Sequence, residues 1–190
     1  MAPRAGLDRE IVLAAAAALV DRDGADGLTV AALAAQLGVR PPSLYNHMES
    51  LEQLQQVLAA RALRELAARM QAAATGLAGA EALRAVALAY RGFVLAHPGR
   101  YGLTVRVRPT DEAYVAASDA TVKVVLAVLR GYQLSEADAI HAARSLRSAV
   151  HGFASLEAAG GFGLPYDLDE SFAWLIQAMD QGLRSSSGRG

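Results

Sequence analysis

The segment from Leu28 to His47 constrains the fold of this 190-residue chain more than any other. Its apolar residues recur at the three- and four-residue spacing of one helix face, at Val30, Leu33, Ala34 and Leu37. Thr29 precedes them as a capping residue, and Gly38 follows them as a residue that ends helices in a left-handed conformation. Pro41 and Pro42 suit the first turn of a second helix, where the backbone needs no N–H partner. The segment therefore predicts two short helices joined by a tight corner.

A helix pair of this kind is the layout of a helix-turn-helix, whose second helix can lie in the major groove of DNA. We therefore expect the second helix to present a set of DNA-contacting residues: Arg40, Pro42, Ser43, Tyr45, Asn46 and His47. Arg40 can donate to guanine or to a phosphate, and Ser43 and Asn46 can meet base edges or phosphates. Thr29 can both cap its helix and touch a phosphate. The alternative is a solvated helix with an ordinary Tyr and His.

At these residues the chain resembles the TetR family of bacterial transcriptional regulators. The resemblance rests on the runs Gly27–Val30, Leu33–Val39 and Leu44–Met48, and it is strong over roughly residues 8–60. It implies that Tyr45 and His47 hydrogen-bond the DNA backbone, so that they position the protein rather than specify the sequence.

Helical periodicity continues beyond this segment, and no strand-like alternation of any length interrupts it. We expect further helices over about residues 8–23, 51–74, 80–96, 100–106, 111–130, 135–160 and 169–184. The first of them should bury Ile11, Ala15, Ala18 and Leu19. The sequence predicts an all-α fold with a three-helix helix-turn-helix domain (residues 1–50) and a roughly six-helix ligand-binding and dimerisation domain (residues 51–184). Residues 185–190, rich in Ser and Gly, are expected to be a flexible tail.

The C-terminal half resembles one TetR subgroup more weakly, through Val150–Phe153 and Phe172–Leu183. That subgroup carries Trp-His-Gly where this chain has Val150-His151-Gly152. The resemblance implies a ligand pocket among the middle helices, for which the candidate residues are Tyr90, Phe93, Tyr101, Leu103, Tyr114, Val122, Leu126, Arg147 and His151. Aromatic and aliphatic walls with a few polar groups suit a small, mostly apolar effector. The alternatives are that the aromatic residues are plain core and that His151 is a hydrogen-bonded core imidazole.

The last two predicted helices carry stripes that suit contact with another helix. Small residues recur on the first at Ser145, Ser148, Gly152 and Ser155, and larger apolar residues recur on the second at Phe172, Leu175, Ile176 and Met179. In TetR-like proteins the last two helices of each subunit form a four-helix dimer interface, which implies a homodimer here. The alternative is that both stripes are buried within one subunit.

Charge and composition bear on DNA binding and on the other functions open to the chain. The net charge is −1, and residues 1–50 hold four Arg against six acidic residues, which does not indicate DNA binding. Leu51 also stands where many family members carry a Lys that meets a phosphate. The absence of Cys excludes disulfides and thiolate metal sites, and the four His residues lack the paired spacing of metal ligands. We expect no metal, no cofactor and no membrane span, and a cytoplasmic location.

Together these features predict a ligand-responsive repressor that binds a palindromic operator as a homodimer. The principal alternative is a helical small-molecule-binding or interaction protein with weak or no DNA binding. An enzyme is not expected, because no Gly-rich phosphate loop occurs and the acidic residues Asp167, Asp169 and Glu170 stand at a predicted helix start.

Overall fold

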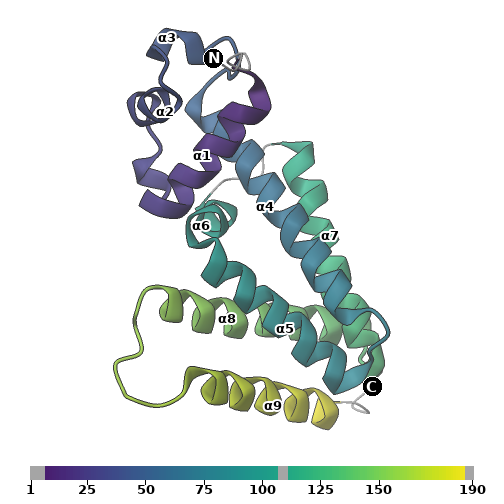
Figure 1. Ribbon diagram of the computed structural model, residues 1–190. Coiled ribbons are helices and arrows are strands. Elements are labelled where there is room, and N and C mark those ends of the chain that lie inside the picture. The colour runs from purple at the N-terminus through teal and green to yellow at the C-terminus, as the bar shows by residue number, and fades with distance from the viewer. Residues whose placement is uncertain (1–6, 107–110, 187–190) are drawn as a thin grey trace. The chain divides into compact units, whose positions relative to one another are not determined.

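The computed structural model describes residues 7–106 and 111–186, which form helices joined by loops (Figure 1). The elements in order are α1 (Arg9–Asp23), the 3-10 turn η1 (Ala25–Gly27), α2 (Val30–Leu37), α3 (Pro41–Leu44), α4 (Leu51–Ala74), α5 (Gly79–Ala96), α6 (Pro98–Arg106), α7 (Glu112–Leu129), the 3-10 turn η2 (Arg130–Tyr132), α8 (Glu136–Ala158) and α9 (Leu168–Ser186). No described residue lies in a β-strand, and the predicted all-α fold is confirmed. None of the described helices has both the length and the apolar composition that crossing a bilayer requires.

Several helices begin at capping residues that the sequence places before them. The Asp8 carboxylate accepts the backbone N–H of Ile11 at 2.8 Å at the start of α1. The Ser50 hydroxyl accepts the N–H of Gln53 at 3.0 Å at the start of α4, and Ser135 caps α8 in the same way. Each contact satisfies one of the N–H groups that the first turn of a helix leaves without a partner.

The C-terminal end of α9 differs from expectation. The helix continues to Ser186, two residues into the segment expected to be a tail. The hydroxyls of Ser185 and Ser186 donate to the carbonyls four residues earlier, at 2.9 and 3.0 Å. They thus give carbonyls of the last turn an additional donor. The remainder of the expected tail, residues 187–190, lies outside the described residues, as do residues 107–110.

The buried face of α1 was predicted wrongly. Of the four expected residues only Leu19 is buried, whereas Ile11 and Ala15 are half-buried and Ala18 is exposed. The residues that α1 buries are Val12, Leu13, Ala16, Leu19 and Val20. The central part of α1 is almost entirely Ala, Leu and Val, so no polar face marks the solvent side and the rotation of the helix cannot be read from its pattern.

The structure divides into two compact units. The first comprises Met1–Ala62 and His97–Val115, and the second comprises Leu63–Ala96 and Ala116–Gly190. The first unit thus includes the start of α4 and all of α6. The functional boundary expected at residue 50 stays a prediction, because compactness does not show which residues bind DNA.

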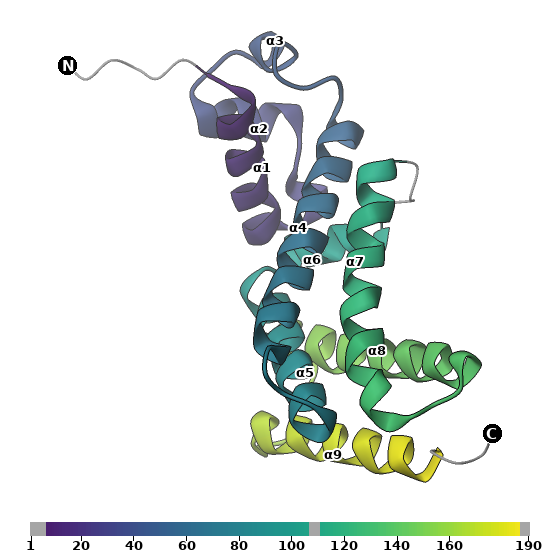
Figure 2. The ribbon, with the colours of Figure 1, turned by 90° about the vertical axis from the view of Figure 1, so that its right-hand side faces the viewer.

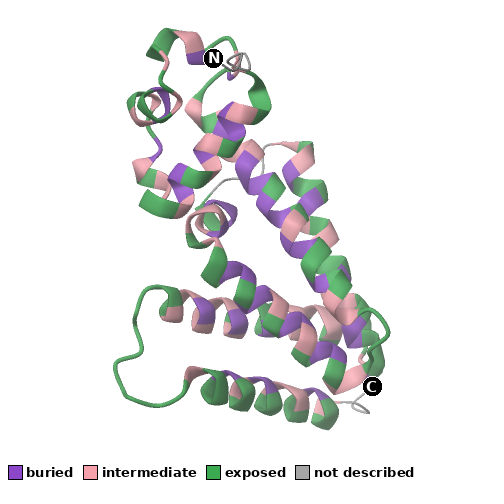
Figure 3. Cartoon of the chain, in the orientation of Figure 1, coloured by how far each residue is buried: buried purple, intermediate pink, exposed green. Residues whose placement is uncertain are grey.

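Each unit has its own core. In the first, α2 packs on α1, α3 packs on α2, and α6 lies beside α1 (Figure 1). Its core includes fully buried leucines, at most 2% exposed: Leu13, Leu19, Leu33, Leu44 and Leu58. In the second unit, α8 and α9 form an antiparallel hairpin that packs against α5 (Figure 2). The buried residues of α5 follow one stripe along the helix (Figure 3), as expected for an amphipathic helix.

Candidate nucleic-acid interface

Helix α2 begins at a capping threonine and is fixed on α1 by a glutamine. Thr29 Oγ1 accepts the backbone N–H of Ala32 at 3.1 Å. The side-chain amide of Gln36 donates to the carbonyl oxygen of Ala15, on α1, at 3.2 Å. Leu33 lies between these contacts and has no exposed surface. Helix α2 is therefore capped by Thr29 at its exposed start and bonded to α1 by Gln36 near its other end.

The corner after α2 depends on a left-handed glycine. Gly38 has φ 66° and ψ 31°, and its N–H donates to the carbonyl of Ala35 at 3.2 Å. The N–H of Val39 donates to the carbonyl of Ala34 at 3.0 Å. This pair of bonds is the Schellman arrangement, which ends a helix and satisfies its last carbonyls. A Cβ on Gly38 would meet no atom within 4 Å, so the backbone conformation, not the available space, favours glycine here.

Helix α3 begins at the two prolines as predicted but is shorter than expected. Its regular part ends at Leu44, and residues 45–47, which were expected on the helix, form a turn. The N–H of His47 donates to the carbonyl of Leu44, three residues earlier, at 2.8 Å. The N–H of Met48 donates to the same carbonyl, four residues earlier, at 3.1 Å, so the turn after α3 combines a 3-10-like and an α-like bond.

The turn after α3 presents polar side chains from a buried support. Leu44 and Met48 are 0% and 4% exposed and hold the two ends of the turn against the core. Between them Tyr45 is 56% exposed, Asn46 is exposed and His47 is half-buried. Of the other residues expected to contact DNA, Arg40, Pro42 and Thr29 are exposed and Ser43 is half-buried. We call residues 40–47 the reading segment.

The acidic residues of the N-terminal part are mostly engaged by cations or by the backbone. Asp8 caps α1, and four others form ion pairs: Glu10 with Arg61, Asp21 with Arg100, Asp23 with Arg22, and Asp26 with Arg106. The hydrogen bonds from Arg61 lower the pKa of the Glu10 carboxyl below its ordinary value, so this group stays ionised near neutrality. Three of these arginines come from beyond residue 50. The first fifty residues therefore present less negative charge to a duplex than their composition implies.

The residues expected to line a ligand pocket are divided between the two units. Three lie in the first unit and are buried: Tyr101, Leu103 and Tyr114. Six lie in the second: Tyr90 and Phe93 are buried, Leu126 and His151 are half-buried, and Val122 and Arg147 are exposed. The His151 ring nitrogen Nδ1 lies 3.3 Å from the hydroxyl oxygen of Ser155. A pocket lined by these residues stays a prediction. Among the described residues, no three His, Asp or Glu side chains gather as metal ligands.

Some residues expected at a dimer interface belong instead to the core of the single chain. Phe172 and Ile176 are 1% and 4% exposed, because their face of α9 packs within the second unit. The ring of Phe172 lies 5.1 Å from the ring of Phe153. The other expected residues are closer to the surface: Ser145 and Ser148 are exposed, and Gly152, Ser155, Leu175 and Met179 are half-buried.

Trp174 is the large apolar residue that the sequence reasoning missed on α9. It is the only tryptophan of the chain and is 72% exposed. It lies two positions after Phe172, which places the two side chains about 200° apart around the helix. Because Phe172 is buried, Trp174 faces away from the core. Tryptophan is enriched at protein–protein interfaces, so this exposed ring marks a candidate interaction surface.

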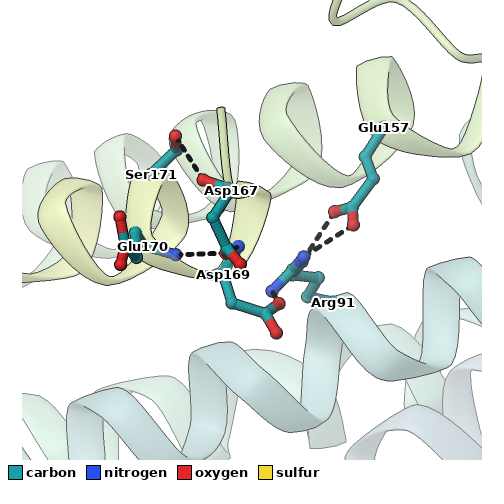
Figure 4. Close-up of polar contacts among 6 residues, drawn as sticks. All are labelled: Arg91, Glu157, Asp167, Asp169, Glu170 and Ser171. Carbon is teal, nitrogen blue, oxygen red and sulfur yellow. Dashed lines mark hydrogen bonds and ion pairs between the residues drawn. The ribbon is translucent and has the colours of Figure 1, made fainter. Parts of the chain in front are cut away.

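A buried arginine fixes the hairpin of α8 and α9 onto α5 (Figure 4). Arg91, 8% exposed, pairs with both oxygens of Glu157 on α8 and with Asp169 on α9, each at 2.6 Å. Its guanidinium lies 5.6 Å from the ring centre of Phe153 and 4.9 Å from that of Phe172. We call these five residues the Arg91 cluster. Beside it, Asp167 accepts the N–H groups of the residues that begin α9 (Figure 4).

Comparison with known proteins identifies matches for both parts of the chain. The family model described as "Bacterial regulatory proteins, tetR family" matches residues 12–56, and the model "Tetracyclin repressor-like, C-terminal domain" matches residues 83–179. The HTH-type transcriptional regulator YobS of Bacillus subtilis is 38% identical over 96% of this chain and 96% of its own length. The HTH-type transcriptional regulator Rv0681 of Mycobacterium tuberculosis is 36% identical over 98% of this chain and 86% of its own length.

A solved structure described as BioQ with its natural double-stranded DNA operator is also similar. It is 26% identical, with a TM-score of 0.66, over 94% of this chain and 99% of that chain.

Proposed function

Because the chain belongs to the TetR family of helix-turn-helix transcriptional regulators, we propose that it is a repressor that binds a palindromic operator as a homodimer. The observation that carries the proposal is the corner of α2, Gly38 and α3, which leaves Arg40 and Tyr45 exposed over a buried Leu44. Similarity to BioQ, whose structure contains its operator, supports DNA as the partner. The proposed place of action is the cytoplasm, where bacterial DNA lies.

The reading segment supplies two kinds of proposed contact. Tyr45 and His47 would donate hydrogen bonds to phosphate oxygens and so fix the register of the protein on the duplex. Thr29 would add a phosphate contact at the start of α2. Arg40 has a planar group able to pair with guanine, and Ser43 and Asn46 would meet base edges or phosphates, with Pro42 against a thymine methyl.

The proposed dimer uses the outward faces of α8 and α9. Between Glu170 and Arg184, every exposed residue of α9 is uncharged, and Trp174 lies among them. A helix face that stays in water usually carries charged residues. The exposed Ser145 and Ser148 leave room for close approach on α8. We therefore assign the interface to this surface. Its proposed apolar anchor is Trp174, and no longer Phe172 and Ile176.

The proposed signal is a small, mostly apolar effector bound among the middle helices, and the protein would act by binding, without catalysis. Tyr90 and Phe93, both on α5, and half-buried Leu126 and His151 supply candidate contacts in the second unit. An effector can release the operator only through different affinities for the DNA-binding arrangement and for another arrangement.

The rival function is a helical ligand-binding protein without useful affinity for DNA. The observation that favours it is Leu51 at the start of α4, where a phosphate-binding Lys is absent. The pairing of the N-terminal acids weakens this rival, because it removes much of the repulsion that the composition implies.

Selection of binding sites from random duplex DNA tests the proposed function. The expected result is an enriched palindrome whose half-sites lie about one helical turn apart, because two identical reading segments must enter successive major grooves. A palindrome would establish both DNA binding and two-fold symmetry. Failure to enrich any sequence at low salt would favour the rival.

Replacing Leu51 by Lys is expected to tighten binding to the selected operator and to steepen its salt dependence. Leu51 is half-buried at the first position of α4, so a longer side chain can extend from it into solvent. One added phosphate contact in each subunit should make the slope of log K against log salt steeper by about 2. Titrations at several salt concentrations measure this slope, with Leu51→Gln as the uncharged control. An unchanged slope would place this position away from the phosphates.

A further inference from the structure

Helix α6 is joined to the end of α1 through the carboxylate of Asp21, which lies outside the reading segment. Asp21, on α1, accepts the backbone N–H of Arg100 at 2.8 Å and the Nε of the same residue at 2.7 Å. The same carboxylate lies 3.2 Å from Nδ1 of His97. These three side chains are each only 19–21% exposed. Together with Gly99 we call them the α1–α6 clasp.

Gly99 permits the close approach of the two helices. A Cβ at this position would lie 1.7 Å from the carbonyl oxygen of Val20 and 2.9 Å from the Cα atom of Asp21. Both are backbone atoms, which cannot turn aside as the end of a side chain can. The two helices therefore meet backbone to backbone, and a larger residue at Gly99 would displace α6 from α1.

The electrostatics of the clasp favour the same arrangement. The end of α1 carries the partial negative charge of its last carbonyls, and the start of α6 carries the partial positive charge of its first N–H groups. Asp21 accepts one of those N–H groups and so caps α6 from a neighbouring helix. The charged or titratable groups that contact the Asp21 carboxylate are the Arg100 guanidinium and the His97 ring.

The connectivity of the chain makes this contact consequential. The helices α1, α2 and α3 are joined covalently to the rest of the chain through α4. Helix α6 follows α5 after the single residue His97, and α5 belongs to the second unit. Without its contacts to α6, of which the clasp is the least exposed, the α1–α3 part would be carried by α4 alone. With them, the α1–α3 part has a second attachment, because it is bound to a helix continuous with α5.

We propose that Asp21 and Gly99 set the spacing between half-sites that the dimer accepts. The proposal rests on the proposed function, because it needs a dimer with two reading segments. Two attachments restrict how far each reading segment can pivot, so both arrive at their half-sites already positioned. Such pre-organisation raises the effective concentration of the second segment at its half-site once the first is bound. Loss of the clasp lowers affinity for the paired sites without changing the contacts made to one half-site.

The test compares DNA duplexes that differ only in the arrangement of half-sites. One duplex carries a single half-site, and the others carry two half-sites at the selected spacing, or one or two base pairs closer or farther apart. Asp21→Ala removes the clasp acceptor. Asp21→Asn keeps an acceptor for the Arg100 N–H but loses the charge. Asp26→Ala is the matched control, because it removes an exposed ion pair to α6 in the same unit.

We expect Asp21→Ala to bind the paired site about tenfold more weakly than the unchanged protein and to bind the single half-site with unchanged affinity. Its preference for one spacing should flatten, with Asp21→Asn intermediate and Asp26→Ala unchanged. Gly99→Ala should reproduce Asp21→Ala. Unchanged single-site binding also shows that the reading segment is folded, and Asp21→Asn serves alone should the alanine variant fail to fold.

Two results would overturn the proposal. Equal losses on the single and the paired sites would mean that Asp21 merely supports the fold of the first unit. An unaltered spacing preference in all three clasp variants would mean that α4 alone positions the reading segment. Failure of the unchanged protein to bind either duplex would instead reject the proposed function and, with it, the dimer geometry on which this inference depends.

Discussion

Replacing Tyr45 and His47 together by alanine is expected to weaken binding to the selected operator by about a thousandfold. Each side chain is proposed to make one hydrogen bond to a phosphate, worth about 1 kcal/mol. The dimer would lose four such bonds, or about 4 kcal/mol, which corresponds to that change in affinity. Fluorescence anisotropy with labelled operator measures the effect. Because Tyr45 is exposed and His47 half-buried, the circular dichroism spectrum should stay unchanged.

Tyr166→Ala is the matched control for this experiment. Tyr166 is also exposed, at 75% against 56% for Tyr45, but it lies in the loop between α8 and α9, in the second unit. It should leave operator affinity unchanged. Operator affinity that survives the double substitution would remove the reading segment from the interface.

Replacing Arg91 by alanine is expected to lower the free energy of unfolding by about 3–5 kcal/mol. The substitution leaves the Glu157 carboxylate, which is only 12% exposed, without its cation and opens space beside the rings of Phe153 and Phe172. Denaturant unfolding at one fixed protein concentration measures the loss, because dimerisation makes apparent stability depend on concentration.

Arg22→Ala provides the comparison for Arg91→Ala. Arg22 pairs with Asp23 on the surface, where water screens the charges, so its removal should change stability little. The double variant Arg91→Met with Glu157→Leu should recover part of the stability, because no unpaired charge is then buried. Equal effects of Arg91→Ala and Arg22→Ala would show that burial adds nothing to the Arg91 pair.

The parts of the structure that the sequence predicted are those decided by neighbouring residues. The cap at Thr29, the left-handed Gly38 and the proline start of α3 each depend on the conformational preferences of one or two residues. The bounds of α4 were predicted for the same reason, from the cap at Ser50 and the helical pattern after it. The end of α3 was not, because no capping residue or glycine marks it after Leu44.

Features decided by packing between distant elements could not be predicted. Helix α9 carries apolar residues on two faces, and its spacing cannot show that Phe172 packs inside the chain while Trp174 faces outward. Arg91 stands among the apolar residues of α5, and its partners are 66 and 78 residues away. The α1–α6 clasp joins residues 79 apart and has no local pattern.

The pairing of the N-terminal acids bears on how regulators of this kind exchange their specificities. Glu10, Asp21 and Asp26 take their cations from Arg61, Arg100 and Arg106, which lie well outside the helix-turn-helix. A graft of residues 1–50 onto a foreign regulator would leave these three carboxylates without their cations. It would also leave α1 without α6, which approaches it closely at Gly99. The unit that must be transferred is therefore made of separate stretches of the sequence. A functional chimera needs the first turns of α4 and the whole of α6 in addition to the reading segment.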